Sequence, residues 1–188
     1  LCGRYNCNKR QLSLKFGINV PMLKKLNKEG PVRNTGARVV TMRRNPKLGV
    51  IKWLGIPEKA DSKIKSEFDY IQLSEEGITK ASVIALADNS GISKKAMAEK
   101  ILDISVKTLE RKDPKSRFDR KISSHAIEIA RVLEHAYEVF EDKEKVKGWI
   151  QTKSKALNDK KPVELFETLT GINLVNDILG RIEEGVYS

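Results

Sequence analysis

The sequence predicts an all-α protein, and two patterns carry this prediction. Apolar residues recur at spacings of three and four in the stretches 122–140 and 171–185, which places them on one face of a helix. Within residues 93–112, two short helical segments are separated by a tight turn, which is the outline of a helix-turn-helix. We therefore expect a helix-turn-helix domain over residues 61–140 and a small helical domain over residues 141–188.

The composition is that of a soluble protein of one or two small domains, with 188 residues that are 39% hydrophobic and 32% charged. Cys2 and Cys7 have no histidine nearby, so we interpret them as thiols in a reducing compartment and not as a metal site. No apolar run reaches the length of a membrane span, and no signal-peptide pattern opens the chain. We expect a cytoplasmic protein that does not bind a membrane.

The net charge of +11 is concentrated at the start of the chain. Residues 1–56 contain 13 Lys and Arg and one acidic residue, Glu29, whereas residues 57–188 contain 23 basic and 24 acidic residues. Glycines and prolines interrupt the leading segment, so we expect residues 1–60 to be a flexible basic arm, with a short strand at Gly49–Ile56. Such an arm would bind nucleic acid through phosphates, or be an extension that is not native. Either way, residues 1–56 are predicted to be dispensable for the fold.

Capping residues locate the helices of the next domain. Ser93 and Ser105 are well placed to cap the two helices of the helix-turn-helix. Ser62–Leu73 should carry a short element, and helices are expected at Ile78–Asp88, Lys94–Leu102 and Val106–Lys112. The last of these would enter the major groove of DNA.

Basic residues gather around this motif. Residues 94–121 contain ten basic and five acidic residues, although a solvated surface without a partner is the alternative interpretation. On the second helix, Leu109 should pack inward while its neighbours face DNA. The predicted DNA-binding residues are Lys94, Lys107, Thr108, Arg111 and Lys112.

One irregularity lies in the first helix of the motif. This helix normally places a small residue four positions before the turn, where the present sequence has Glu99, with Ala98 one position earlier. We therefore expect the first helix to be longer than usual and its docking angle on DNA to differ.

The second half of the chain is expected to be built on a spine helix at Ile122–Phe140, which begins at Ser123 or Ser124. His125 and His135 on this helix are interpreted as structural or exposed residues. Shorter helices should follow at Asp142–Gln151 and at Val163–Leu169, the latter opened by Pro162.

The last helix should be capped by Thr170 and stopped by Gly185. Its apolar residues, among them Leu174 and Ile178, cover more than half of its circumference, so we expect it to be packed on both sides. It either closes its own domain or docks on a partner.

The end of the chain resembles a known family. The run LGRIEEGVYS at 179–188, with ALNDKKPVELFETLTG at 156–171 and Trp149 before it, closely resembles the Xre/MbcA/ParS toxin-binding domain. That domain ends the antitoxins of bacterial toxin–antitoxin pairs, notably those that neutralise RES-domain toxins. The resemblance covers residues 78–188 and implies an Xre-like amino-terminal half. The sequence departs from the family at Lys153, where proline is common, and by one extra residue before Ile104.

The resemblance implies an inhibitor without a cofactor of its own, because family toxins of the RES type consume NAD. Some members also repress their own operon. Expected partners are a cognate RES-domain toxin and operator DNA, with a homodimer inside a hetero-oligomeric complex.

The neutralising element is predicted at the carboxyl end, where an exposed Val-Tyr pair after a helix stop is typical of an interface anchor. Residues 181–188 should cover the entrance to the toxin's active site. The predicted toxin-binding residues are Leu165, Leu179, Arg181, Ile182, Glu183, Val186, Tyr187 and Ser188.

No enzyme motif is found in the sequence, which lacks a glycine-rich phosphate loop and a Cys/His cluster, so a binding protein is predicted. Two alternatives to the antitoxin remain at this stage. One is a free-standing helix-turn-helix regulator whose C-terminal helices serve dimerisation, and the other is a general nucleic-acid-binding protein driven by the basic arm.

Overall fold

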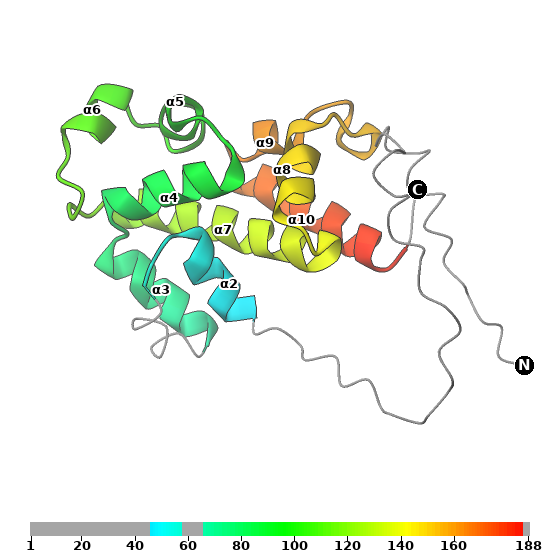
Figure 1. Ribbon diagram of the computed structural model, residues 1–188, viewed down its shortest axis with the longest axis horizontal. Coiled ribbons are helices and arrows are strands. Elements are labelled where there is room, and N and C mark those ends of the chain that lie inside the picture. Colours follow the sequence, from blue (N-terminus) through cyan, green and yellow to red (C-terminus); the bar gives the residue numbers. More distant parts are fainter. Residues whose placement is uncertain (1–45, 58–65, 186–188) are drawn as a thin grey trace, which may run out of the picture. The chain divides into compact units, whose positions relative to one another are not determined.

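The computed structural model describes residues 46–57 and 66–185, and every regular element in these ranges is a helix (Figure 1). The helices are α2 (Pro46–Trp53), α3 (Glu67–Glu76), α4 (Lys80–Ser90), α5 (Lys94–Ala96), the π-helical turn η3 (Met97–Ile101), α6 (Val106–Arg111), α7 (Arg120–Phe140), α8 (Lys143–Gln151), the 3-10 turn η4 (Lys155–Leu157), α9 (Pro162–Leu165) and α10 (Leu169–Glu183). Within these ranges, β-pairing is limited to two isolated bridges, Thr79 with Arg117 and Ser154 with Lys160. The predicted all-α class is confirmed. None of the described helices combines the length and the apolar character that crossing a membrane requires.

The spine helix α7 is the element on which the described part of the chain is assembled. It packs against α2, α3, α4, α8 and α10, and it buries residues around most of its circumference. Asp119 caps it by accepting a hydrogen bond from the Ile122 amide at 2.9 Å, so the helix begins before the predicted serines. Ser123 is buried instead, and its hydroxyl accepts a hydrogen bond from the Ile78 amide at 3.0 Å. This bond joins α7 to the residue that precedes α4.

Helix α2 corrects two predictions about the leading segment. The stretch expected to be a strand is helical up to Trp53, and four of its five apolar side chains lie in the core with at most 4% exposure, while Ile56 is partly buried. The buried residues are Val50, Ile51, Trp53 and Leu54. Gly49 permits the close approach to α7, because a Cβ at this position would lie 1.7 Å from the Glu134 carboxyl carbon.

A boundary at residue 60 is therefore wrong for residues 46–57, which belong to the folded unit Arg44–Ser188. The prediction that residues 1–56 are dispensable fails for the same reason. The remaining part of the arm, residues 1–45, lies outside the described residues.

Helix α10 begins earlier than predicted and buries only one face. Thr168 and not Thr170 is its cap, since the Thr168 hydroxyl accepts a hydrogen bond from the Gly171 amide at 3.0 Å. Gly185 has φ +71°, and its amide donates to the Ile182 carbonyl at 3.2 Å, as a helix stop requires. Leu174 is 43% exposed, so the expected burial on both sides is wrong.

The segment before α10 is also shorter than predicted. Helix α9 is four residues long, and the chain turns between Leu165 and Leu169. A Cβ on Gly171 would lie 2.0 Å from the Leu165 carbonyl oxygen, so this glycine lets the first turn of α10 approach the end of α9.

Candidate functional site

The helix-turn-helix is formed by α5, η3 and α6, and its two caps are those that the sequence predicts. The Ser93 hydroxyl accepts a hydrogen bond from the Ala96 amide at 3.2 Å, and the Ser105 hydroxyl accepts one from the Thr108 amide at 3.0 Å. Leu109 is 4% exposed and anchors α6 to the core, as predicted. The caps and this anchor fix which face of α6 points outward.

Three predicted DNA-binding residues share the outer face of α6, and all three are exposed: Lys107, Thr108 and Arg111. Lys94, at the start of α5, is exposed as well, and its ammonium lies 4.0 Å from the Asp88 carboxylate. An exposed pair at that distance contributes little, so Lys94 is available to a phosphate. The structure places these three cations and the Thr108 hydroxyl on one motif, and their contact with DNA stays a prediction.

Lys112 is placed differently from the other predicted DNA contacts. It is half-buried, and its ammonium lies 5.2 Å from the centroid of the Phe118 ring. A cation over a ring face is stabilised by the ring quadrupole. Lys112 therefore closes the end of α6 against the following loop, in addition to any role on the surface.

The irregular first helix contains a π-helical turn, where a longer regular helix was predicted. The Leu102 amide donates to the Met97 carbonyl at 3.0 Å, a span of five residues, which bulges one residue out of the helix. As a result Ala98 is fully buried while Glu99 is exposed, so the small residue keeps the inward position. Asp103 then adopts φ +53° in the turn.

Lys80 ties the end of α6 to the start of α4, a contact that the sequence analysis missed. Its ammonium donates to the backbone carbonyls of Glu110 at 2.8 Å and of Lys112 at 2.6 Å. The last carbonyls of a helix carry partial negative charge, which a lysine satisfies. The Lys80 amide also donates to the Ser116 carbonyl at 2.9 Å. In the sequence, the only indication of this contact is a lysine at the start of a predicted helix.

At the other end of the molecule, the predicted toxin-binding residues divide into core and surface. Leu179 is fully buried, so its predicted role as a toxin contact is corrected to that of a core residue. Leu165 and Ile182 are partly buried and pack against the core. Arg181 and Glu183 are exposed. The other three predicted contacts, Val186, Tyr187 and Ser188, lie outside the described residues.

An exposed stripe runs along α10 that the sequence analysis did not single out. Its members recur at spacings of three or four, and we call them the α10 stripe: Leu169, Asn173, Leu174, Asp177 and Arg181. Leu169 is 55% exposed and Leu174 is 43% exposed, which makes them two of the four exposed large hydrophobic residues in the described ranges. Leu169 and Leu174 are five positions apart, so they lie at different edges of this exposed face with polar residues between them.

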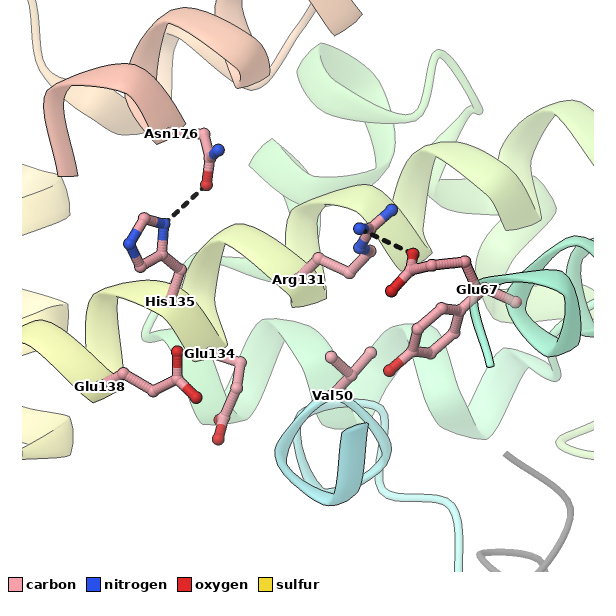
Figure 2. A pocket seen from close by; sticks show the side chains of 8 residues that line it. Val50, Glu67, Arg131, Glu134, His135, Glu138 and Asn176 are labelled. Atoms are coloured by element: carbon pink, nitrogen blue, oxygen red, sulfur yellow. Dashed lines mark hydrogen bonds and ion pairs between the residues drawn. The ribbon is translucent and has the colours of Figure 1, made fainter. Parts of the chain in front are cut away.

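Two histidines join α7 to the C-terminal helices and support this surface from behind. His125 Nε2–H donates to the Phe166 carbonyl at 2.7 Å. The Nδ1 atom of His135 lies 2.7 Å from the Asn176 amide oxygen (Figure 2). Its Nε2 atom lies 3.4 Å from the Glu183 carboxylate. Both histidines therefore have structural roles.

The cavity shown in Figure 2 has a volume of about 200 Å³ and lies beside His135, where α2, α3, α7 and α10 meet. Arg131 closes one side of it by pairing with Glu67 at 2.9 Å. Burial raises the pKa of Glu138 in its wall, while His135 lowers that pKa and Glu183 raises it. No group of His, Cys, Asp and Glu in the described part of the chain is arranged to hold a metal ion.

A helix-turn-helix with exposed cations on α6 is joined by the long helix α7 to a C-terminal region whose last helix carries two exposed leucines. Two protein families match these same regions. Residues 69–131 match the antitoxin Xre-like helix-turn-helix domain, and residues 135–185 match the antitoxin Xre/MbcA/ParS C-terminal toxin-binding domain.

Two relatives agree with the family matches. The chain is 38% identical over 73 residues to the antitoxin Xre of Yersinia enterocolitica serotype O:8 / biotype 1B, covering 38% of this chain and 49% of that protein. It is 29% identical over 91 residues to the antitoxin Xre of Photorhabdus laumondii subsp. laumondii, covering 47% of this chain and 62% of that protein. The chain thus spans about half to three fifths of the relatives it matches. These matches bear out the predicted resemblance to Xre-type antitoxins over residues 69–131 and 135–185.

Proposed function

We propose that this chain is the antitoxin of a bacterial toxin–antitoxin pair, that it neutralises a RES-domain, NAD-consuming toxin, and that it also binds operator DNA. The observation that carries the proposal is the pairing of the two matched domains on one chain. The exposed cations of α6 lie in the matched helix-turn-helix domain, and the exposed leucines of α10 lie in the matched toxin-binding domain.

The toxin would dock on the α10 stripe and on residues 181–188. Leu169 and Leu174 supply apolar area that is exposed in the free chain. Arg181 and Glu183 are exposed polar residues beside them, at the point where the chain continues towards Tyr187. Aromatic side chains are preferred anchors of protein interfaces, so Tyr187 is the expected hot spot at the toxin's active-site entrance.

Toxin inhibition by three purified variants tests this part of the proposal. Tyr187→Ala should weaken the complex by about 2 kcal/mol, or roughly thirtyfold in dissociation constant. Leu174→Glu should also weaken it, and because Leu174 is exposed the fold should persist. Leu179→Ala is the contrasting core variant, expected to lower stability first. Full inhibition by both Tyr187→Ala and Leu174→Glu would refute the proposed surface.

DNA binding would use the outer face of α6 in the major groove. Arg111→Ala should cost about 1–3 kcal/mol if the guanidinium reads a base, and Lys107→Ala should reduce the salt slope by about one if its ammonium neutralises a phosphate. These effects are measured by fluorescence anisotropy on the upstream region of the gene pair. Unchanged binding in both variants would exclude α6 as the recognition helix.

We also propose that the chain acts as a homodimer within the toxin complex, because helix-turn-helix proteins read two half-sites about 34–36 Å apart. Light scattering of the chain alone and with toxin tests this. A monomer bound to a single half-site would contradict it.

A further inference from the structure

Charge is strongly segregated along the folded part of the chain, and a second basic segment lies in the toxin-binding domain. Residues 143–161 contain seven lysines and two acidic residues, the same excess of five as residues 94–121. The intervening residues 122–142 contain one basic and five acidic residues. The helix-turn-helix is therefore one of two cationic regions of equal net charge.

Three of the four lysines in the loop between α8 and α9 are exposed, and the fourth, Lys161, is partly buried. We call Lys153, Lys155 and Lys160 the lysine loop. In the described ranges, none of the three makes an ion pair with a carboxylate, whereas Lys147 on α8 is paired with Glu144 at 2.8 Å. Their charges are available to an anionic partner.

The backbone of this loop is held in one conformation. The Ser154 amide donates to the Lys160 carbonyl at 3.0 Å, and the Asp159 amide donates to the Ser154 carbonyl at 2.9 Å. Leu157 is 3% exposed and fixes the loop to the core. Asn158 and Asp159 adopt φ of +54° and +58°, the left-handed conformation that Asn and Asp tolerate best among non-glycine residues. The lysine loop therefore presents its charges from a rigid base, which lowers the entropic cost of binding.

The position of the loop relates it to the helix-turn-helix. Helix α8 packs against α4, and the side chain of Lys147 lies 3.4 Å from where a Cβ on Gly91 would be, at the turn that leads into α5. From there α8 leads directly into the lysine loop. In Figure 1, α9 and α8 lie between α5 and this loop.

The chemistry of the region favours nucleic acid over protein as the partner. Lysine is depleted in the cores of protein interfaces, whereas it is a common phosphate ligand. The exposed large hydrophobic residues of the described part are Phe68, Ile71, Leu169 and Leu174, and none of them lies in residues 143–161. A cationic surface without apolar area is suited to a sugar-phosphate backbone.

We propose that the lysine loop is a second phosphate-binding surface, which contacts the DNA backbone beside the base pairs that α6 reads. This inference rests on the proposed DNA binding by the helix-turn-helix. It gives the toxin-binding domain a direct part in DNA binding, so that one domain serves both partners through separate surfaces.

The salt dependence of DNA binding by the full chain tests the proposal. The probe is a duplex of about 30 bp, long enough for roughly three helical turns. In the triple variant Lys153→Gln, Lys155→Gln, Lys160→Gln, the slope of log K against log salt should become shallower by about 2–3, at roughly 0.9 per phosphate. From about 50 to 200 mM salt, the variant should then lose roughly fortyfold less affinity than the unaltered chain.

Two controls accompany the triple variant. The triple Lys→Arg variant at the same positions should keep the original slope, because it keeps the charge. Arg181→Gln, on the α10 stripe, should leave the slope unchanged. Far-UV circular dichroism verifies the fold, and if the triple variant unfolds, Lys155→Gln alone should reduce the slope by about one.

The outcomes separate the two proposals. If the unaltered chain does not bind duplex DNA at low salt, DNA binding by the helix-turn-helix fails and the lysine loop fails with it. If Arg111→Ala weakens binding while the triple glutamine variant keeps the slope, only the lysine loop is overturned. Loss of toxin binding in that variant with an unchanged DNA slope would likewise overturn it, in favour of a protein partner.

Discussion

Replacing Trp53 tests whether α2 is part of the core. Its side chain is 1% exposed, and its indole N–H donates to the Glu134 carboxylate at 2.9 Å in a buried site. Trp53→Phe keeps most of the apolar surface but removes the donor to a charged acceptor, which should cost about 2–3 kcal/mol. Trp53→Ala also leaves a cavity, so its cost should reach about 5 kcal/mol. Against a total stability of about 5–15 kcal/mol, the alanine variant should be close to unfolding.

Trp149→Phe is the matched control for the loss of an indole. Trp149 is 8% exposed and packs against Phe140 with ring centroids 5.4 Å apart and the ring planes tilted by 46°, and its N–H makes no hydrogen bond within the described residues. The control should therefore cost less than about 1.5 kcal/mol. Urea denaturation followed by far-UV circular dichroism measures both variants.

Equal and small costs for Trp53→Phe and Trp149→Phe would refute the reasoning. Two shortened chains test independently whether α2 is part of the core. A chain that begins at Arg44 keeps α2, and a chain that begins at Pro57 lacks it. Only the second should show a large fall in thermal midpoint.

Three further perturbations have defined outcomes. Asp103→Gly should raise the free energy of unfolding by about 0.5–1 kcal/mol in urea denaturation, because φ is +53° there, whereas Asp103→Ala should not raise it. Lys80→Met should speed hydrogen exchange in α6 more than in α7, since it removes two bonds to the end of α6, and equal rates would exclude this role. Burial raises the pKa of Glu138 above its ordinary 4.5, so the folded state loses stability as the pH rises from about 4.5 through the folded pKa. Glu138→Gln should lack this loss, so its free energy of unfolding relative to that of the unaltered chain should increase over that pH range. If this difference in free energy stays constant with pH, the raised pKa of Glu138 is contradicted.

The sequence predicted well those elements whose signal is local. Helix α7 has a strong apolar period, and Ser93 and Ser105 mark the starts of α5 and α6. Exposed Lys107 and Arg111 follow from the same spacing, because the buried Leu109 fixes the face of a short helix.

The errors come from features that depend on tertiary contacts. Helix α2 is an apolar run that was mistaken for a strand, since short buried helices and strands share one pattern. Helix α10 was expected to be buried on two sides, but apolar composition does not show which leucines meet a neighbour, and Leu174 meets solvent. The contact of Lys80 with the end of α6 joins residues at least 30 positions apart.

The π-helical turn falls between these two cases. The position of Glu99 revealed an extra residue, yet the sequence did not show how the helix would accommodate it. Burial of Ala98 decides the outcome, because a small residue is required where α5 and η3 approach the core, and a bulge keeps it there.

The measurement that most directly tests the proposed antitoxin role is NAD consumption by the proposed partner, a RES-domain toxin, as purified chain is added. The account predicts that activity falls to zero at a fixed molar ratio, and that a chain ending at Glu184 inhibits far less while its helix content, with α10 ending at Glu183, is retained. Undiminished NAD consumption in the presence of excess folded, full-length chain would contradict the central claim.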